Sequence, residues 1–504
     1  MTEETLGPLE AESATPAPPP GPLSAQVLRS FANRFGTRIL VGGLQLGAFA
    51  VLAAHLGPSR AGVYTFAVGF AALFQPLVTF GLRAVALREI AQGRATESQL
   101  LPNVLYLRLV VAGLTYLLLW GVVARIGYTP AERSAALVVG LVLVPSALRS
   151  FDVAFELRLR LGWVSIADLV ESAAFCGGTI ALALSHAGTL AFAWLYFGVN
   201  LAYVVVVSGA AWPVVRPRWR PQPAAWLPLV KAAAPVGLAG AFVAAYYRID
   251  MAILAALKSQ AVVGQYGVAY QLFDAMSVVP GLAAQVVGPV FARSFAAGPQ
   301  LLADRLGRAL RLGCLWLVLT GVGGAMVAWR ALPALPGLGR YHGAGVALAV
   351  LAPGAGLILL NTMISAALIH AHLQRRLLAV SAMVLVLNVG LDAALIPPFS
   401  YVGAAVATVV SEVAVVVASL GLLVRGLGVR LAVPGLGRIA LVGVVLAVCL
   451  GAGYLVHPFV QLAMGAVAFG VGALAIRAVA WGELAGAITP LKRQAGDPPP
   501  IGKN

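Results

Sequence analysis

Charged residues are scarce in this chain. Lys, Arg, Asp and Glu make up 10% of the 504 residues, against about 25% in soluble domains, and only 18 residues are acidic. Hydrophobic residues make up 60%. So few charges cannot cover the surface of a water-soluble protein of this length, which excludes a soluble fold. Apolar stretches of about 20 residues, long enough to span a bilayer as helices, recur throughout. The sequence therefore predicts an all-α polytopic membrane protein.

Cysteines and the motifs of cofactor chemistry are also rare. The three cysteines, Cys176, Cys314 and Cys449, each lie in an apolar stretch, which favours packing roles over disulfides or a metal site. No Gly-x4-Gly-Lys-Ser/Thr, His-Glu-x-x-His or Cys-x-x-Cys motif occurs. His370 and His372 are two residues apart and therefore face different sides of a helix. The sequence predicts no enzyme, no cofactor and no metal site.

The apolar stretches predict about fourteen transmembrane helices. They lie at 37–56, 61–82, 103–124, 134–150, 162–184, 188–211, 232–256, 264–291, 308–328, 344–369, 377–396, 400–424, 436–456 and 459–481. Orientation follows from the 34 lysines and arginines, because cytoplasmic loops are enriched in them. With the N-terminus inside, 27 of them fall on the cytoplasmic side, Arg248 lies within a span, and six fall outside, namely Arg60, Arg125, Arg133, Lys258, Arg330 and Arg340. Both termini are therefore predicted to be cytoplasmic.

The spans divide the chain into six parts. These are a disordered cytoplasmic tail (1–23), an N-terminal lobe of a short interfacial helix and six spans (24–212), a basic cytoplasmic linker (213–230), a C-terminal lobe of six spans (231–424), two further spans (425–484) and a second cytoplasmic tail (485–504). The net charge of +16 is explained by this topology, and it predicts contact with anionic membrane lipids and no nucleic-acid partner.

One hairpin is present twice. Residues 52–68 (LAAHLGPSRAGVYTFAV) and 254–270 (LAALKSQAVVGQYGVAY) align so that Gly62 pairs with Gly264 and Tyr64 with Tyr266. Each copy is an apolar run, a short polar turn, a Gly-x-Tyr and a second apolar run. Because six spans precede the linker, the two halves enter the membrane in the same sense, as parallel repeats do. Two related halves of this kind commonly enclose a transport site.

Charges inside the predicted spans are the first candidate functional residues. A charged side chain at the bilayer centre costs about 2.5–3.5 kcal/mol, so such residues usually face a partner or a wet cavity. Arg248 and Asp250 lie about 200° apart around the seventh span and cannot neutralise each other. Tyr246 and Tyr247 share a face with Asp250 and are its candidate hydrogen-bond partners. Either Arg248 contacts an anionic substrate group while Asp250 binds a cation or orients the arginine, or each pairs with another helix.

Other polar residues in or near the spans are weaker candidates. The candidate substrate ligands are Gln45, Gln271, Asp274 and Asn361. The candidate ion-coupling groups are Asp274 and Glu412, together with Asp250. Arg38 and Arg83 at the cytoplasmic mouth could bind phosphate groups, and Asp168 and Glu171 are a further pair in the fifth span. Asp392 is expected at the membrane interface, near an outer helix end. For each of these residues a packing or hydrogen-bonding role is the alternative.

Several segments resemble the polysaccharide-biosynthesis (O-antigen/oligosaccharide) flippases of the multidrug/oligosaccharidyl-lipid/polysaccharide exporter superfamily. The first repeat matches their pattern with Leu56-Gly57, Gly62-x-Tyr64, Gly81-Leu82 and Arg88-Glu89, and the segment around Arg248-Ile-Asp250 resembles their seventh span. The segment 397–412 resembles the start of their twelfth span, although 399–402 replaces the usual first glycine. The resemblance covers about residues 30–425.

The resemblance implies movement of undecaprenyl-diphosphate-linked oligosaccharide across a bacterial or archaeal cytoplasmic membrane, through a central cavity between two six-helix lobes. Its partners would be that glycan lipid and, further, polysaccharide polymerase and export machinery. Arg248 is the residue expected to contact phosphate. One alternative is a cation-coupled small-molecule antiporter that uses Asp250, Asp274 and Glu412. The others are a membrane polysaccharide polymerase or ligase, for which no large external loop is predicted, and a scaffold that transports nothing.

Overall fold

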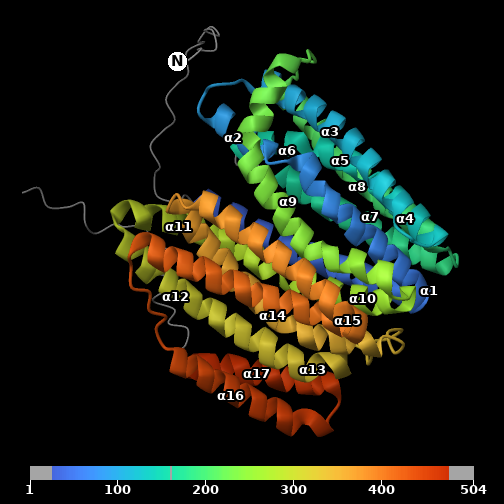
Figure 1. Cartoon of the computed structure of the whole chain (residues 1–504), viewed down its shortest axis with the longest axis vertical. Coiled ribbons are helices and arrows are strands. Elements are labelled where there is room, and N and C mark those ends of the chain that lie inside the picture. The colour runs from blue at the N-terminus through green and yellow to red at the C-terminus, as the bar shows by residue number, and fades with distance from the viewer. Residues whose placement is uncertain (1–24, 159–161, 476–504) are drawn as a thin grey trace, which may run out of the picture.

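The computed structural model describes residues 25–158 and 162–475, and every regular element in these ranges is helical (Figure 1). The first half contains α1 (Ala25–Thr79), α2 (Leu82–Ala91), α3 (Glu97–Arg125), α4 (Pro130–Gly140), α5 (Leu143–Leu148), the 3-10 turn η1 (Arg149–Phe151), α6 (Asp152–Leu157), α7 (Gly162–Leu184) and α8 (Thr189–Val215). After the 3-10 turn η2 (Pro223–Ala225), the second half contains α9 (Trp226–Leu257), α10 (Gln260–Met276), α11 (Val278–Ala297), α12 (Pro299–Val318), the π-helical η3 (Leu319–Gly323), α13 (Gly324–Ala331), α14 (His342–His370) and α15 (Gln374–Leu427). The last elements are α16 (Leu436–Ala452), the 3-10 turn η4 (Gly453–Leu455) and α17 (Pro458–Ala475). The two predicted tails, 1–23 and 485–504, lie outside the described residues.

Eleven helical segments of the described residues are long and apolar enough to cross a membrane. Two long helices contain a sharp break. Gly57 divides α1 with φ 72° and ψ 171°, and Ser400 divides α15 with φ 57° and ψ −137°. Positive φ is easy for glycine and unusual for serine. The two legs of α15 fold back on each other, since the side chain of Asn388 donates a hydrogen bond to Ser411 at 3.2 Å.

Three predicted elements differ in the structure. The described part of the segment predicted as an interfacial helix, 25–36, is not a separate helix, because α1 runs without a break from Ala25 to Gly57. The predicted span 134–150 is divided into α4, α5 and η1. The predicted span 264–291 is divided at Ser277 into α10 and α11. Apolar periodicity alone could not locate the last two breaks, because apolar residues continue on both sides of each.

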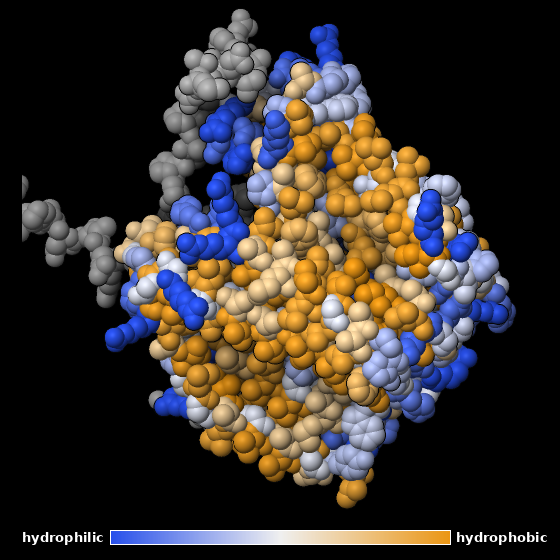
Figure 2. Space-filling view, viewed as in Figure 1, coloured by the Kyte–Doolittle hydropathy of each residue, from blue (hydrophilic) through white to orange (hydrophobic). Residues whose placement is uncertain are grey.

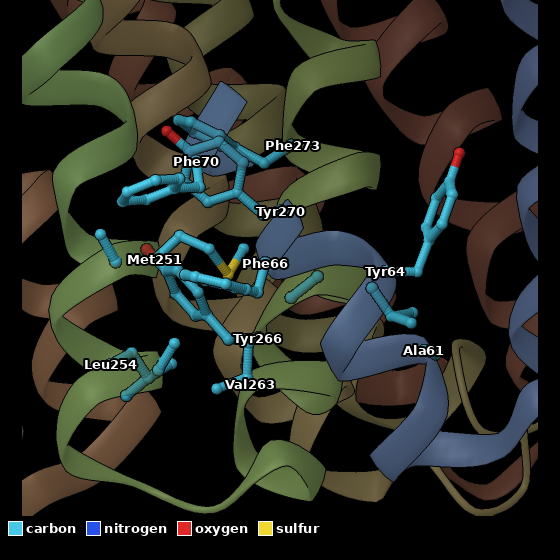
Figure 3. Packing of buried hydrophobic residues seen from close by; sticks show 14 of the residues in the cluster. Ala61, Tyr64, Phe66, Phe70, Met251, Leu254, Val263, Tyr266, Tyr270 and Phe273 are labelled. Carbon is cyan, nitrogen blue, oxygen red and sulfur yellow. The ribbon is translucent and has the colours of Figure 1, made fainter. Parts of the chain in front are cut away.

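The two copies of the repeated hairpin pack directly against each other where α1 meets α10. A methyl group added to Gly62 would lie 1.9 Å from the carbonyl oxygen of Gln260, and one added to Gly264 would lie 1.9 Å from that of Pro58. The backbones therefore touch with near two-fold symmetry, as small residues allow in membrane helices. Just beyond this crossing lies a buried apolar cluster that includes Phe66 and Phe70 of α1 (Figure 3).

The end of the molecule at which the hairpins turn (57–60 and 257–263), here called the hairpin end, is fastened by the segment before α14. The Tyr341 hydroxyl donates a hydrogen bond to the carbonyl oxygen of Ala53 at 2.8 Å, and Arg340 donates one to Ala54, also at 2.8 Å. Burial raises the pKa of Tyr341, so its hydroxyl remains a neutral donor. These bonds tie the second half to the first at the hairpin end.

The opposite end contains residues 216–222 and is here called the linker end. There the first turns of α9 pack into the first half. A methyl group added to Gly237 would lie 2.8 Å from Phe80, and Leu229 and Ala233 belong to the buried cluster of α2 and α3. The remainder of α9 packs against α15, where Tyr246 contacts Val384 and Val415. In Figure 1, α9 accordingly runs between α3–α8 on one side and α11–α17 on the other.

Candidate functional site

Arg248 is paired across two helices. It lies on α9 and donates a hydrogen bond to Asp274 of α10 at 2.7 Å, and its guanidinium carbon lies 5.0 Å from the centre of the Tyr270 ring. The two charged side chains retain 28% and 35% of their exposure. The prediction that Arg248 does not pair with Asp250 is confirmed. An accessible arginine in the middle of a span can exchange its carboxylate partner for another anion.

Asp250 faces the opposite way and is buried. It accepts hydrogen bonds from the backbone N–H of Met251 at 2.7 Å and from the Tyr266 hydroxyl. The expectation that Tyr246 and Tyr247 bind Asp250 is wrong. The Tyr246 hydroxyl donates to Glu412, and the carbonyl oxygen of Tyr247 accepts from Tyr270.

Asp250 belongs to a group of buried carboxyls between α9 and the two legs of α15. Asp392 and Glu412 are completely buried, and Asp392 interacts electrostatically with Asp250. Within the described residues, neither carboxyl oxygen of Asp392 and only one of Glu412 has a hydrogen-bond partner. Asp392 was expected near an outer helix end at the membrane interface, and in the structure the folded-back legs of α15 cover it.

Oxygen and nitrogen atoms of neutral residues lie on the same two legs. Asn388 is one turn before Asp392, and its side chain bonds to Ser411 at 3.2 Å, while the Thr408 hydroxyl donates to the carbonyl oxygen of Ala404 at 3.0 Å. No group of three or more His, Cys, Asp or Glu in the described ranges has the arrangement of a metal centre. The donor set, rich in oxygen and poor in nitrogen and sulfur, suits a proton or an alkali cation better than a transition metal.

A second charged cluster lies in the first half. Arg149, on η1, donates to Glu171 of α7 at 2.9 Å and to the amide oxygen of Asn200 on α8 at 3.3 Å, and its guanidinium carbon lies 3.8 Å from the centre of the Tyr203 ring. Sequence reasoning missed Arg149, because it assigned this residue to the cytoplasmic end of the fourth span. The available signal was Glu171, a carboxylate inside the fifth span that needs a cation.

The two clusters are electrostatic neighbours. Tyr196 of α8 interacts electrostatically with Glu171 and Arg149 of the first half and with Arg248 of the second half. Tyr196 is therefore within electrostatic range of an arginine of each half. The arrangement gives two partly accessible guanidinium groups, each paired with a carboxylate, on the two halves of one membrane protein.

The remaining predicted residues are spread more widely. Gln45 donates to Ser172 of α7 at 3.3 Å, and Arg38 lies 3.9 Å from Asp168, so both residues of α1 border the first-half cluster. Arg83 is exposed on α2. Gln271 is half-buried on α10, the helix of Asp274, and Asn361 accepts a hydrogen bond from Ser365 of its own helix at 3.2 Å.

Comparisons with known proteins give the family and the fold. A sequence profile described as polysaccharide biosynthesis protein matches residues 27–295. The structure of the lipid II flippase MurJ in an inward closed conformation superposes with a TM-score of 0.70, at 12% identity, over 90% of this chain and 99% of that one. An inward-facing multidrug resistance transporter of the MATE family and MOP superfamily superposes with a TM-score of 0.57, at 13% identity, over 78% and 98%. No curated protein matches significantly in sequence. At these identities the two structures show a shared fold.

Proposed function

We propose that this chain, which belongs to the polysaccharide biosynthesis protein family, moves a polyprenyl-diphosphate-linked glycan between the two leaflets of the membrane by alternating access. Family membership and the MurJ-like fold support transport of a lipid-linked glycan by a multi-pass membrane protein. The finer assignment, to undecaprenyl-diphosphate-linked oligosaccharide for surface polysaccharide synthesis, rests on the chemistry of the candidate site.

The observation that supports this function most is the accessible pair Arg248–Asp274. A diphosphate requires cationic hydrogen-bond donors, and the planar guanidinium group matches phosphate oxygens with two parallel N–H bonds. When the diphosphate binds, Arg248 exchanges the carboxylate of Asp274 for a phosphate. When it leaves, Asp274 takes its place again, so that the arginine is never left unpaired in the membrane.

The proposal includes a transmembrane topology, that is, a number of spans and their orientation. The breaks at Gly57 and Ser400 turn two of the eleven candidate spans into four, and the shorter apolar segment Pro458–Leu474 adds one more. We therefore propose fourteen spans, arranged as two six-span lobes and a C-terminal pair. Because the linker end holds most of the arginines, we assign it and both termini to the cytoplasm of a bacterial or archaeal cell.

Energy for directional transport is assigned to the buried carboxyls. Two carboxylates in a low-dielectric interior are stable only with a proton or cation to neutralise them. Asp250 and Asp392 are such a pair, and the amide of Asn388 and the hydroxyl of Thr408 lie on the same α15 legs. We assign binding of a proton or a monovalent cation to this group, with Glu412 as its neighbour.

The buried carboxyls also favour the second candidate, a cation-coupled antiporter of small molecules. The two functions make different demands on Arg248, because a guanidinium group repels a cationic drug and attracts a diphosphate. A polymerase or ligase is less favoured, since the hairpin-end turns in the described ranges are short.

Purified protein in liposomes, given a fluorescent polyprenyl-diphosphate disaccharide, should move the label to the opposite leaflet. Transport of a cationic dye in the same liposomes, without movement of the lipid, would favour the antiporter.

Asp392→Asn is expected to uncouple transport from the ion gradient while leaving the protein folded, because asparagine keeps the shape of the side chain and removes its charge. A monovalent ion crossing 100 mV supplies about 2.3 kcal/mol, or about a 50-fold driving force. The measurement compares lipid movement with and without sodium or proton gradients. Asp304→Asn, at an exposed carboxylate bonded to Gln300, is the matched control. A gradient response in Asp392→Asn equal to that of the unmodified protein would exclude Asp392 from coupling.

A further inference from the structure

A groove opens between the two legs of α15 at the linker end. It has a volume of about 540 Å³ and is lined by Arg376 near the start of the first leg and by Arg425 near the end of the second. Three of its other lining residues are small, Ala418, Gly421 and Gly426, and are here called its floor; Val417 and Leu422 complete the lining. A methyl group added to Gly421 would meet nothing within 4 Å, so the floor is open. The groove therefore joins two cationic side chains to a slot with little side-chain bulk.

An exposed apolar stripe leads away from the groove along the second leg. Val417, Val413 and Val410 are 64%, 45% and 42% exposed. Helical periodicity places these three valines on the same face as Gly421 and Arg425. On the visible face of the molecule, hydrophobic side chains form a broad surface and hydrophilic ones gather toward two opposite ends (Figure 2). A molecule that fits this track has an anionic head and an extended hydrocarbon chain.

The two arginines are available to a ligand. Both are exposed, and neither makes an ion pair with a described residue. Arg248 and Arg149 differ in this respect, because each already has a carboxylate partner. Two guanidinium groups without a carboxylate partner bind a phosphate tightly. An arginine that already has a carboxylate partner binds it more weakly and suits a phosphate that is released again.

We propose that this groove is a binding site for one anionic phospholipid of the leaflet at the linker end. Its headgroup phosphate lies between Arg376 and Arg425, and one acyl chain lies along Val417, Val413 and Val410. The lipid would bridge the ends of the two α15 legs that enclose Asp392 and Glu412. Each basic group near an anionic headgroup contributes about fivefold in affinity, so the pair should contribute about 30-fold.

The test measures lipid binding, which does not depend on transport of any glycan lipid. Delipidated purified protein is titrated with phosphatidylglycerol or phosphatidylcholine, and bound lipids are counted by native mass spectrometry. The unmodified protein should retain one phosphatidylglycerol more tightly than the others. The variant R376Q/R425Q should bind it about 30-fold more weakly. R430Q removes an exposed arginine at the same end of the molecule, outside the groove, and should bind as the unmodified protein does.

A second variant separates the groove from general attraction to charge. Gly421→Leu fills the open floor, keeps both arginines and should also lose the tight phosphatidylglycerol. Equal affinity for phosphatidylglycerol in the unmodified protein and in R376Q/R425Q would overturn the proposal, as would equal affinity for phosphatidylcholine. Competition by farnesyl diphosphate that depends on the same two arginines would assign the groove to the substrate and would also overturn it.

Discussion

Replacing Arg248 by alanine is expected to lower transport of a polyprenyl-diphosphate-linked glycan by about 10- to 100-fold. A hydrogen bond between charged groups contributes about 1.5–3 kcal/mol, and each 1.4 kcal/mol corresponds to a factor of ten. The substitution removes the guanidinium that we assign to the diphosphate and leaves Asp274 without the partner it has at 2.7 Å. Initial rates of lipid movement in proteoliposomes, divided by the amount of folded protein, measure the effect.

Two further variants separate phosphate recognition from loss of the ion pair. Arg248→Ala combined with Asp274→Ala removes the unpaired carboxylate, so it should restore stability without restoring transport. Asp274→Asn keeps the arginine and should slow transport less than Arg248→Ala does, since the guanidinium still meets the phosphate. Full transport by the double variant would assign the pair a purely structural role, and the proposed contact with diphosphate would be wrong.

The sequence contained enough information for the membrane class, the repeated hairpin and the separation of Arg248 from Asp250. Each of these depends on local pattern: apolar length, a repeated Gly-x-Tyr, and the 100° rotation between successive residues in a helix. These patterns can be interpreted without knowing the tertiary structure, because lipid requires every span to satisfy its own backbone hydrogen bonds and therefore to be helical. The family resemblance added the expected substrate, which no residue pattern could supply.

The partners of the charged residues could not be predicted in the same way. Asp392 seemed interfacial because it lies near the end of a predicted span, and only the reversal of α15 at Ser400 buries it. Arg149 seemed to be an ordinary basic residue at a span end, and only the irregular α4–α5–η1 segment places it against Glu171 and Tyr203. Both depend on backbone breaks, which hydrophobic periodicity does not reveal.

The hairpin and the buried carboxyls are connected through one tyrosine. Tyr266 is the tyrosine of the second Gly-x-Tyr, two residues after Gly264, and its hydroxyl donates to Asp250. The first copy has Tyr64 at the same place, but Ala48 stands where the second half has Asp250. The duplicated element therefore serves two purposes: it closes the hairpin end in both halves, and in the second half it also reaches the candidate ion site.

The close approach of the two hairpins leads to the second large prediction, that Gly264→Ala strongly destabilises the protein. The added methyl group would lie 1.9 Å from the carbonyl oxygen of Pro58, a backbone atom that cannot move alone, so α1 and α10 must separate. Overpacking of this kind costs about 1–3 kcal/mol or more. The thermal unfolding midpoint of the detergent-purified protein should fall, and Gly62→Ala should behave alike because Gln260 is equally close.

Gly240→Ala is the matched control for this pair of variants. Gly240 is a helical glycine on α9 whose added methyl group would meet nothing within 4 Å, so alanine there should stabilise the helix by up to about 1 kcal/mol. The changes in the unfolding midpoint should have opposite signs. Alanine favours a helix at all three positions, and only the close contact between the hairpins makes it destabilising at Gly62 and Gly264. If Gly264→Ala and Gly240→Ala shift the unfolding midpoint equally, the hairpins do not touch in the membrane, and the symmetric contact between the two halves is absent.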